Sequence, residues 1–304
     1  MLFLNTTTRK LRLKFILIFF SLIFFCCNKN SIPTNPNPPN PDGKTIIDRN
    51  PVWSFNGKEI AYSGGDEVIG FGIYIVDTNG NSRKKILDHY IEDITWSPDG
   101  QWIAYDDGGN IFKKKVYGDS IVQLTSSASN FSPSWSKDGK WIAYESNESS
   151  PNGFIFVWKM TPDGFDKRRI LYDPSQGEIR RPSWFPDGIR LAVIRYPTGS
   201  YSANIGIIDT LGNTIAFLVN DSLTNRVPKV SNDGTQITYY RDKNHGEICT
   251  INIDGSNFQI ITTHGITPDW SPDHEKIVYT NTTYGDGRIW LMNKNGSSKK
   301  KLFN

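Results

Sequence analysis

The sequence predicts an all-β protein, a six-bladed β-propeller of four-stranded antiparallel blades, and three observations support this fold. A short motif built on Trp-Ser-Pro-Asp-Gly recurs six times in the 304 residues. Its tryptophan position returns at intervals of 39 to 49 residues, which is about the length of one four-stranded blade. No window of useful length has the apolar period of 3.6 residues that indicates a helix.

The six motifs share an apolar position, tryptophan in five of them, which is followed three residues later by Asp or Asn. They occupy Pro51–Gly57, Ile94–Gly100, Pro133–Gly139, Pro182–Gly188, Pro228–Gly234 and Pro268–His274. Val230 and His274 depart from the pattern at single positions. One such sheet cannot bury both its faces alone, so we expect six sheets to pack radially, with the tryptophans as wedges between neighbouring blades.

Each repeat predicts the same four strands in the same order. The strand that carries the tryptophan enters an Asp-Gly turn, which suits a tight hairpin. A return strand follows, as at Gln101–Tyr105, and then a third strand such as Ile73–Val76 and a fourth such as Lys84–Leu87. The hairpin aspartates recur once per blade, and we interpret them as turn residues rather than metal ligands. They are Asp99, Asp138, Asp187, Asp233 and Asp273.

Two segments compete for the outer strand of the sixth blade. Lys299–Phe303 follows its turn at the distance seen in the other repeats, so its loop-closure cost is lower. We therefore expect it to be the fourth strand of that blade. Thr45–Ile47 is then expected to pair outside it or to lie along the seam between the first and last blades.

Residues 1–26 are predicted to be a lipoprotein signal peptide. Four basic residues precede the apolar run Phe15–Phe25, which is far shorter than the roughly 20 apolar residues that span a bilayer. The run ends in Cys26-Cys27, which resembles a bacterial lipobox. Lipidation needs a small residue before the modified cysteine, so we predict Cys27 as the lipidation site. An ordinary signal peptide that ends in two cysteines is the alternative.

The rest of the chain divides into a linker and one domain. Residues 27–43 form a lipidated, Pro/Asn-rich tether without apolar periodicity, and residues 44–304 form the propeller. The formal charge is +3, and removing the four basic residues of the signal peptide leaves −1. A near-neutral chain without a basic face does not suit nucleic-acid binding. We expect a monomer in which Cys249 is a small, buried side chain.

The motif Trp-Ser-Pro-Asp-Gly, followed by Ile-Ala-Tyr and a second Asp-Gly turn, resembles the TolB-type propeller, a WD40-like repeat of bacterial periplasmic proteins. The resemblance covers residues 44–304. It implies the propeller fold and a place in the bacterial cell envelope, on the periplasmic face of the outer membrane or at the cell surface. We expect only the tether in place of the α/β domain that precedes the propeller in TolB, so membership of the Tol–Pal machinery is not implied.

The candidate ligand-binding mouth lies where the first strands enter the channel. Arg49, Asp93, Arg181 and Arg226 stand three or four residues before the tryptophan position of their repeats. Arginine forks suit carboxylates, including a peptide C-terminus or an acidic sugar. Alternatively, the arginines pair with Glu92, Asp93 and loop acids such as Asp66 and Glu178, and hold the blades together.

Catalysis has little support in the sequence. The loop histidines His89, His245 and His264 are expected to lie apart around the ring, and we predict no metal site and no cofactor. No Gly-x-Ser-x-Gly elbow occurs. The leading hypothesis is a non-catalytic envelope lipoprotein that binds a protein, peptide or glycan at the channel mouth. The alternative is a lyase or hydrolase of acidic oligosaccharides, because the similar oligogalacturonate lyases use a propeller with a His-lined metal site.

Overall fold

The computed structural model describes residues 47–65, 69–89, 91–150, 153–170, 177–200, 202–283 and 287–303. These residues belong to one compact unit, Pro39–Asn304. The predicted signal peptide, the tether and Cys27 lie outside the described residues. In the part of the chain that is described, no helix is long and apolar enough to cross a membrane.

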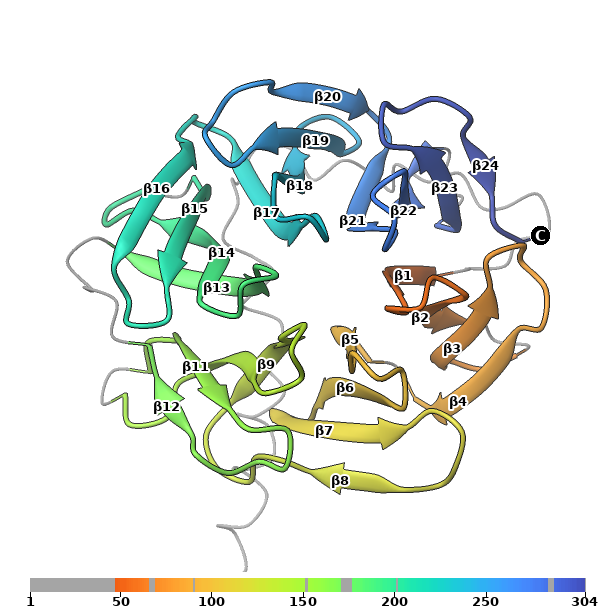
Figure 1. Ribbon diagram of the computed structural model, residues 1–304, viewed down its shortest axis with the longest axis horizontal. Coiled ribbons are helices and arrows are strands. Elements are labelled where there is room, and N and C mark those ends of the chain that lie inside the picture. Colours follow the sequence, from red (N-terminus) through yellow and green to blue (C-terminus); the bar gives the residue numbers. More distant parts are fainter. Residues whose placement is uncertain are drawn as a thin grey trace, which may run out of the picture. The chain divides into compact units, whose positions relative to one another are not determined.

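The described unit is a ring of six four-stranded antiparallel sheets, as predicted (Figure 1). Blade one contains β1 (Ile47–Trp53), β2 (Glu59–Gly65), β3 (Gly72–Asp77) and β4 (Lys84–Asp88). Blade two contains β5 (Ile94–Trp96), β6 (Trp102–Asp107), β7 (Asn110–Lys115) and β8 (Ile121–Gln123). Blade three contains β9 (Asn130–Trp135), β10 (Ile142–Ser146), β11 (Phe156–Met160) and β12 (Arg168–Arg169).

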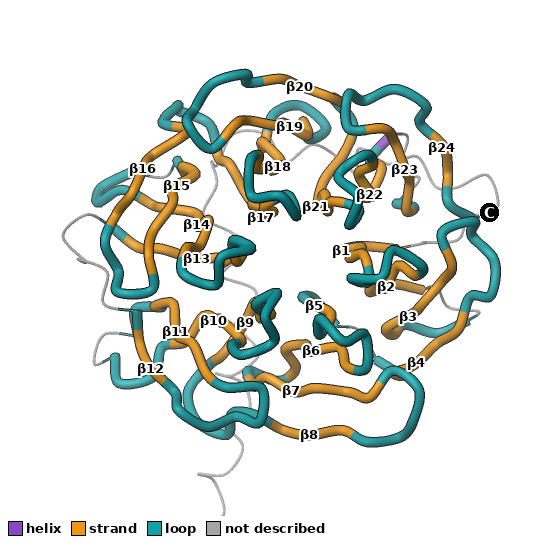
Figure 2. Tube along the Cα trace, in the orientation of Figure 1, coloured by secondary structure: helices purple, strands orange, loops and turns teal. Residues whose placement is uncertain are grey.

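The second half of the ring repeats this arrangement, with the strands of each blade again consecutive in the chain. Blade four contains β13 (Glu178–Trp184), β14 (Arg190–Tyr196), β15 (Asn204–Asp209) and β16 (Thr214–Val219). Blade five contains β17 (Thr224–Val230), β18 (Gln236–Asp242), β19 (Glu247–Asn252) and β20 (Gln259–Thr262). Blade six contains β21 (Gly265–Trp270), β22 (Lys276–Asn281), β23 (Ile289–Asn293) and β24 (Lys300–Lys301). Figure 2 shows the first strand of each blade at the centre.

The hydrophobic core consists of six clusters, and each cluster lies between two successive blades. Trp96, for example, packs with Val52, Ala61 and Ile73 of the preceding blade. The five motif tryptophans are between 2% and 8% exposed. The predicted role of tryptophan as a wedge between blades is confirmed, and Val230 takes the same position in blade five.

Two kinds of hydrogen bond alternate around the inner ring. The indole N–H of Trp96, Trp184 and Trp270 donates to a backbone carbonyl of the preceding blade, at 3.0 to 3.2 Å. At the other three interfaces, the backbone N–H at the tryptophan position instead donates to a side-chain oxygen of the preceding blade. Those acceptors are Thr95, Ser183 and Asp269. Each of the six interfaces thus has one polar contact beside its apolar cluster.

The ring closes between blades one and six as the sequence predicts for its C-terminus. The strand β24 pairs with β23 through Trp290 and Lys301, so the C-terminal segment is the fourth strand of blade six. Ile47 belongs to β1, and the backbone N–H of Asp48 donates to the carbonyl of Gly287 at 2.9 Å. Of the two placements expected for the N-terminal segment, the one along the seam therefore fits the described part, while Thr45 and Ile46 lie outside it.

Candidate functional site

A bulge near the start of the innermost strand shapes one end of the channel. In five blades the residue three positions before the tryptophan has a φ of +49° to +54°. Those residues are Asn50, Ser132, Arg181, Val227 and Thr267. The pairing register shifts at each of them, as it does when an extra residue enters one strand. Such bulges re-aim side chains, and here they bring the predicted mouth residues to one end of the channel.

Arg181 is the centre of a network that joins three blades. Its guanidinium pairs with Asp93 of blade two through a short contact between Nη1 and Oδ2. Its backbone N–H donates to Oε1 of Glu145 in blade three at 2.8 Å, and its Nε lies 4.0 Å from the same oxygen. The hydroxyl of Ser132 donates to Asp93 at 2.9 Å. Since both ends of Arg181 have partners, its side chain is engaged by the protein itself.

Carboxylates outnumber guanidinium groups around Arg181. Asp106 accepts a hydrogen bond from the backbone N–H of Asp93 at 3.1 Å. Loss of water and then the charge of Asp93 raise the pKa of Asp106 well above its usual value. The same two causes raise the pKa of Glu92, against the opposing effects of Arg181 and Arg49. This half of the mouth therefore disfavours further negative charge and would be stabilised by a positive group.

The other predicted arginines differ in how far they are engaged. Arg180 pairs with Glu178 at 3.0 Å, as the alternative interpretation expects. Arg226 lies 4.0 Å from Asp242, and both side chains are more than one third exposed. Arg49 is exposed and has no ion pair among the residues that the structure describes. Arg49 and Arg226 are thus the arginines of the mouth most open to a ligand.

Sequence reasoning missed the contribution of the second strands. Asp106, Glu145 and Tyr240 each follow the apolar triplet that matches Ile-Ala-Tyr in their blades. Burial raises the pKa of Tyr240, and the charge of Arg226 opposes that shift, so this phenol belongs to the same end of the channel. The position after the triplet is the signal that could have identified these residues.

The histidines are arranged differently from the prediction. The rings of His245 and His264 stack, with centroids 5.3 Å apart and planes 12° from parallel, because their two connections lie on the same side of neighbouring blades. The expectation that they lie apart was wrong for this pair. His89 instead bonds Asp107 at 2.9 Å. Within the described ranges, no group of three or more His, Cys, Asp or Glu residues could hold a metal ion.

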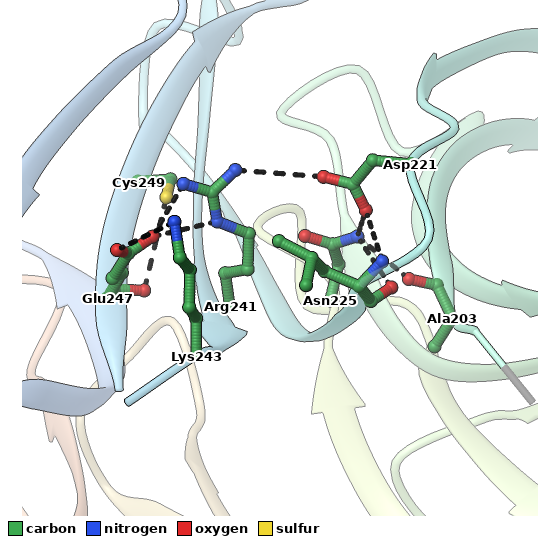
Figure 3. Close-up of polar contacts among 8 residues, drawn as sticks. Ala203, Asp221, Asn225, Arg241, Lys243, Glu247 and Cys249 are labelled. Atoms are coloured by element: carbon green, nitrogen blue, oxygen red, sulfur yellow. Dashed lines mark hydrogen bonds and ion pairs between the residues drawn. The ribbon is translucent and has the colours of Figure 1, made fainter. Parts of the chain in front are cut away.

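A second charged cluster, in blade five, is structural (Figure 3). The Arg241 guanidinium binds Glu247, with Nη2 2.5 Å and Nε 2.9 Å from Oε2, and its Nη1 lies 3.7 Å from Asp221. Asn225, which is fully buried, donates to Asp221 and to the carbonyl of Ala203 in blade four. Nearby, burial raises the pKa of the fully buried Cys249 thiol to about 12. These contacts tie blade four to blade five, and Cys249 is inert as expected.

Comparison with known proteins begins with sequence. A family model described as the TolB beta propeller domain matches residues 42–265 and 118–304. An uncharacterized protein of Agrobacterium fabrum is 28% identical over 158 residues, which are 47% of this chain and 53% of that protein. The chain thus spans about half the length of that curated relative.

Solved structures share the fold at low sequence identity. A putative TolB from Agrobacterium tumefaciens has a TM-score of 0.66 and 22% identity, over 76% of this chain and 87% of that one. TolB from Acinetobacter baumannii has a TM-score of 0.67 and 22% identity, over 80% of this chain and 62% of that one. An oligogalacturonate lyase from Vibrio parahaemolyticus has a TM-score of 0.56 and 13% identity, over 85% and 92%. Since the family model matches well over half of the chain, the chain belongs to the TolB β-propeller domain family.

Proposed function

We propose that this protein is a non-catalytic binding protein of the bacterial cell envelope, and that its ligand is a protein or peptide segment held at the channel mouth. The observation that carries the proposal is the convergence of charged side chains from blades one to five at one end of the channel. Arg181 connects Asp93 and Glu145 there, and Arg49 and Arg226 remain open beside them.

The charges at the mouth indicate the chemistry of the ligand. The initial hypothesis was that arginines of the mouth would bind a carboxylate, but Arg181 already has two carboxylate partners. The raised pKa values of Glu92 and Asp106 indicate an excess of acidic groups. We therefore expect a lysine or arginine of the ligand to enter the acidic half, beside Glu92. A glycan is the competing ligand class.

Site-specific photo-crosslinking in cells tests where the ligand binds. A photoreactive phenylalanine derivative placed at Arg226 reports on the mouth, and the same residue at Lys140 reports on the opposite end. Lys140 is a matched control because its side chain is 75% exposed. We expect a protein adduct at position 226 only. Equal labelling at both positions, or at neither, would contradict a protein ligand at the mouth.

The place of the protein in the cell rests on its family and on its N-terminal sequence. TolB-like relatives support the envelope as its location, and lipidation of Cys27 would attach the tether to a membrane. Cys27→Ser should leave an unprocessed precursor that takes up no labelled palmitate, whereas Cys26→Ser should still be processed because serine is small. Fatty-acid labelling of the Cys27→Ser chain would rule out this anchor.

A further inference from the structure

A small cavity occupies the channel at the end where the first hairpin of each blade turns, opposite the mouth. Its volume is about 90 Å³, and residues of all six blades line it. Most of the lining consists of the motif tryptophans and of the residues just before them. Three charged side chains also line it, Lys137, Lys229 and Asp269.

The three charges come from different blades and do not balance. Asp269 of blade six already accepts a hydrogen bond from the backbone N–H of Trp53, at 2.8 Å. Lys229 occupies the equivalent position in blade five, and Lys137 reaches the cavity from the first hairpin of blade three. The Nζ atom of Lys137 is buried and has no hydrogen-bond partner among the described residues. Two ammonium groups thus share one carboxylate.

An unpartnered buried ammonium is costly, and its titration reflects this. Burial lowers the pKa of Lys137 to about 8, and the charges of Asp269 and Asp233 only partly offset that shift. Burial likewise raises the pKa of Asp269, despite the opposing charge of Lys229. A buried charge without a partner is rare in native proteins unless something else binds it. An anion in the cavity would supply the missing partner of Lys137.

The cavity also limits the size of its occupant. A water molecule takes up about 30 Å³ in the liquid, so this space suits three waters or one small ion. Pockets for sugars or drug-sized ligands usually measure roughly 300 Å³ or more. The Thr95 and Ser183 oxygens accept backbone hydrogen bonds at 3.4 and 3.3 Å, which leaves both hydroxyl hydrogens able to donate to an anion.

We propose that this cavity binds one small carboxylate, with Lys137 and Lys229 each donating to one of its oxygens. The site lies at the end of the channel opposite the mouth, so the proposal does not depend on the proposed function. The carboxylate can come from a free acid such as formate or from the C-terminus of a chain that enters past the hairpins. Both sources present the same group to the two lysines.

Tryptophan fluorescence of the full-length chain, titrated with sodium formate at constant ionic strength, tests the proposal. Trp53, Trp135 and Trp270 border the cavity, so binding should change the emission in a saturable manner. Lys137→Gln should weaken the binding at least tenfold. Lys140→Gln, in the same hairpin but 75% exposed, should not change it. Affinity should fall as the pH rises above 8, because Lys137 loses its proton.

Further measurements distinguish the sources and the controls. A tripeptide with a free C-terminus that displaces formate, while its amidated form does not, would assign the site to chain ends. Formate binding without competition would assign it to free acids. Glu92→Gln, at the mouth, should leave formate binding unchanged, so the two proposals fail separately. A fluorescence response that never saturates, or that is equal in Lys137→Gln with an unchanged melting temperature, would overturn the proposal.

Discussion

Single side chains close the first hairpin of each blade by the same hydrogen bonds. In blade five, the hydroxyl of Ser231 donates to Asp233 at 2.6 Å, and the backbone N–H of Thr235 donates to the same carboxylate at 3.0 Å. Burial alone would raise the pKa of Asp233, but these hydrogen bonds outweigh it and lower the value to about 2. The interpretation of the hairpin aspartates as turn residues explains these contacts.

This lowered pKa predicts how stability changes with pH. The folded state binds the ionised form of Asp233 better than the unfolded chain does, so its contribution is complete above pH 4 and is lost as the pH falls toward 2. Asp233→Ala should cost about 1 kcal/mol at pH 7, and less at pH 2.5. Urea unfolding at both pH values measures this. An equal loss at the two pH values would mean that ionisation of Asp233 does not matter.

At the scale of the strands, the repeat pattern carries most of the fold. The hairpins, the tryptophan wedges and the fourth strand at Lys300–Lys301 were all predictable, because each depends on local residues at fixed spacing. The partner of Arg181 was not predictable as a unique residue. The bulge that turns this side chain toward Asp93, two blades away, depends on the ring geometry. The stacking of His245 on His264 likewise depends on which connections share a face.

The alternation of hydrogen bonds between the blades gives a matched pair of variants. Trp184 and Trp135 are similarly buried, but only the indole of Trp184 has a hydrogen-bond partner among the described residues, the carbonyl of Ser134. Both changes to phenylalanine remove the same volume. Trp184→Phe should therefore cost about 1–2 kcal/mol more than Trp135→Phe in denaturant unfolding, because it leaves a buried carbonyl without a partner. Equal losses would show that the indole hydrogen bond adds no stability.

At the scale of the whole ring, one seam joins the first blade to the last. Asp48 is fully buried, with Arg288 at 3.2 Å and Arg83 at 3.5 Å from its oxygens. The guanidinium of Arg83 lies over the ring of Phe303, 4.8 Å from its centroid, and Phe303 stacks on Tyr62. Because the seam unites residues from both ends of the domain, it forms only when the ring is complete.

Removal of the last strand tests the importance of this seam. Deleting Lys299–Asn304 removes Leu302 from the cluster between blades six and one and removes the Phe303 ring. We expect the whole domain to be destabilised in one cooperative transition, since an open propeller exposes two sheet edges. Thermal unfolding followed by circular dichroism and by tryptophan fluorescence measures this. A truncated chain that melts like the full chain would show that closure lies elsewhere.

The central claim is that the acidic half of the mouth binds a cationic group of a peptide, and an array of peptides tests it most directly. Each array sequence carries Lys, Gln or Glu at one varied position. The account predicts that the lysine forms bind best, that added salt weakens them, and that Glu92→Gln reduces the preference for lysine. Glu275→Gln, with a 61% exposed side chain at the hairpin end, should not. A preference for glutamate forms, or one that Glu92→Gln leaves unchanged, would contradict the account.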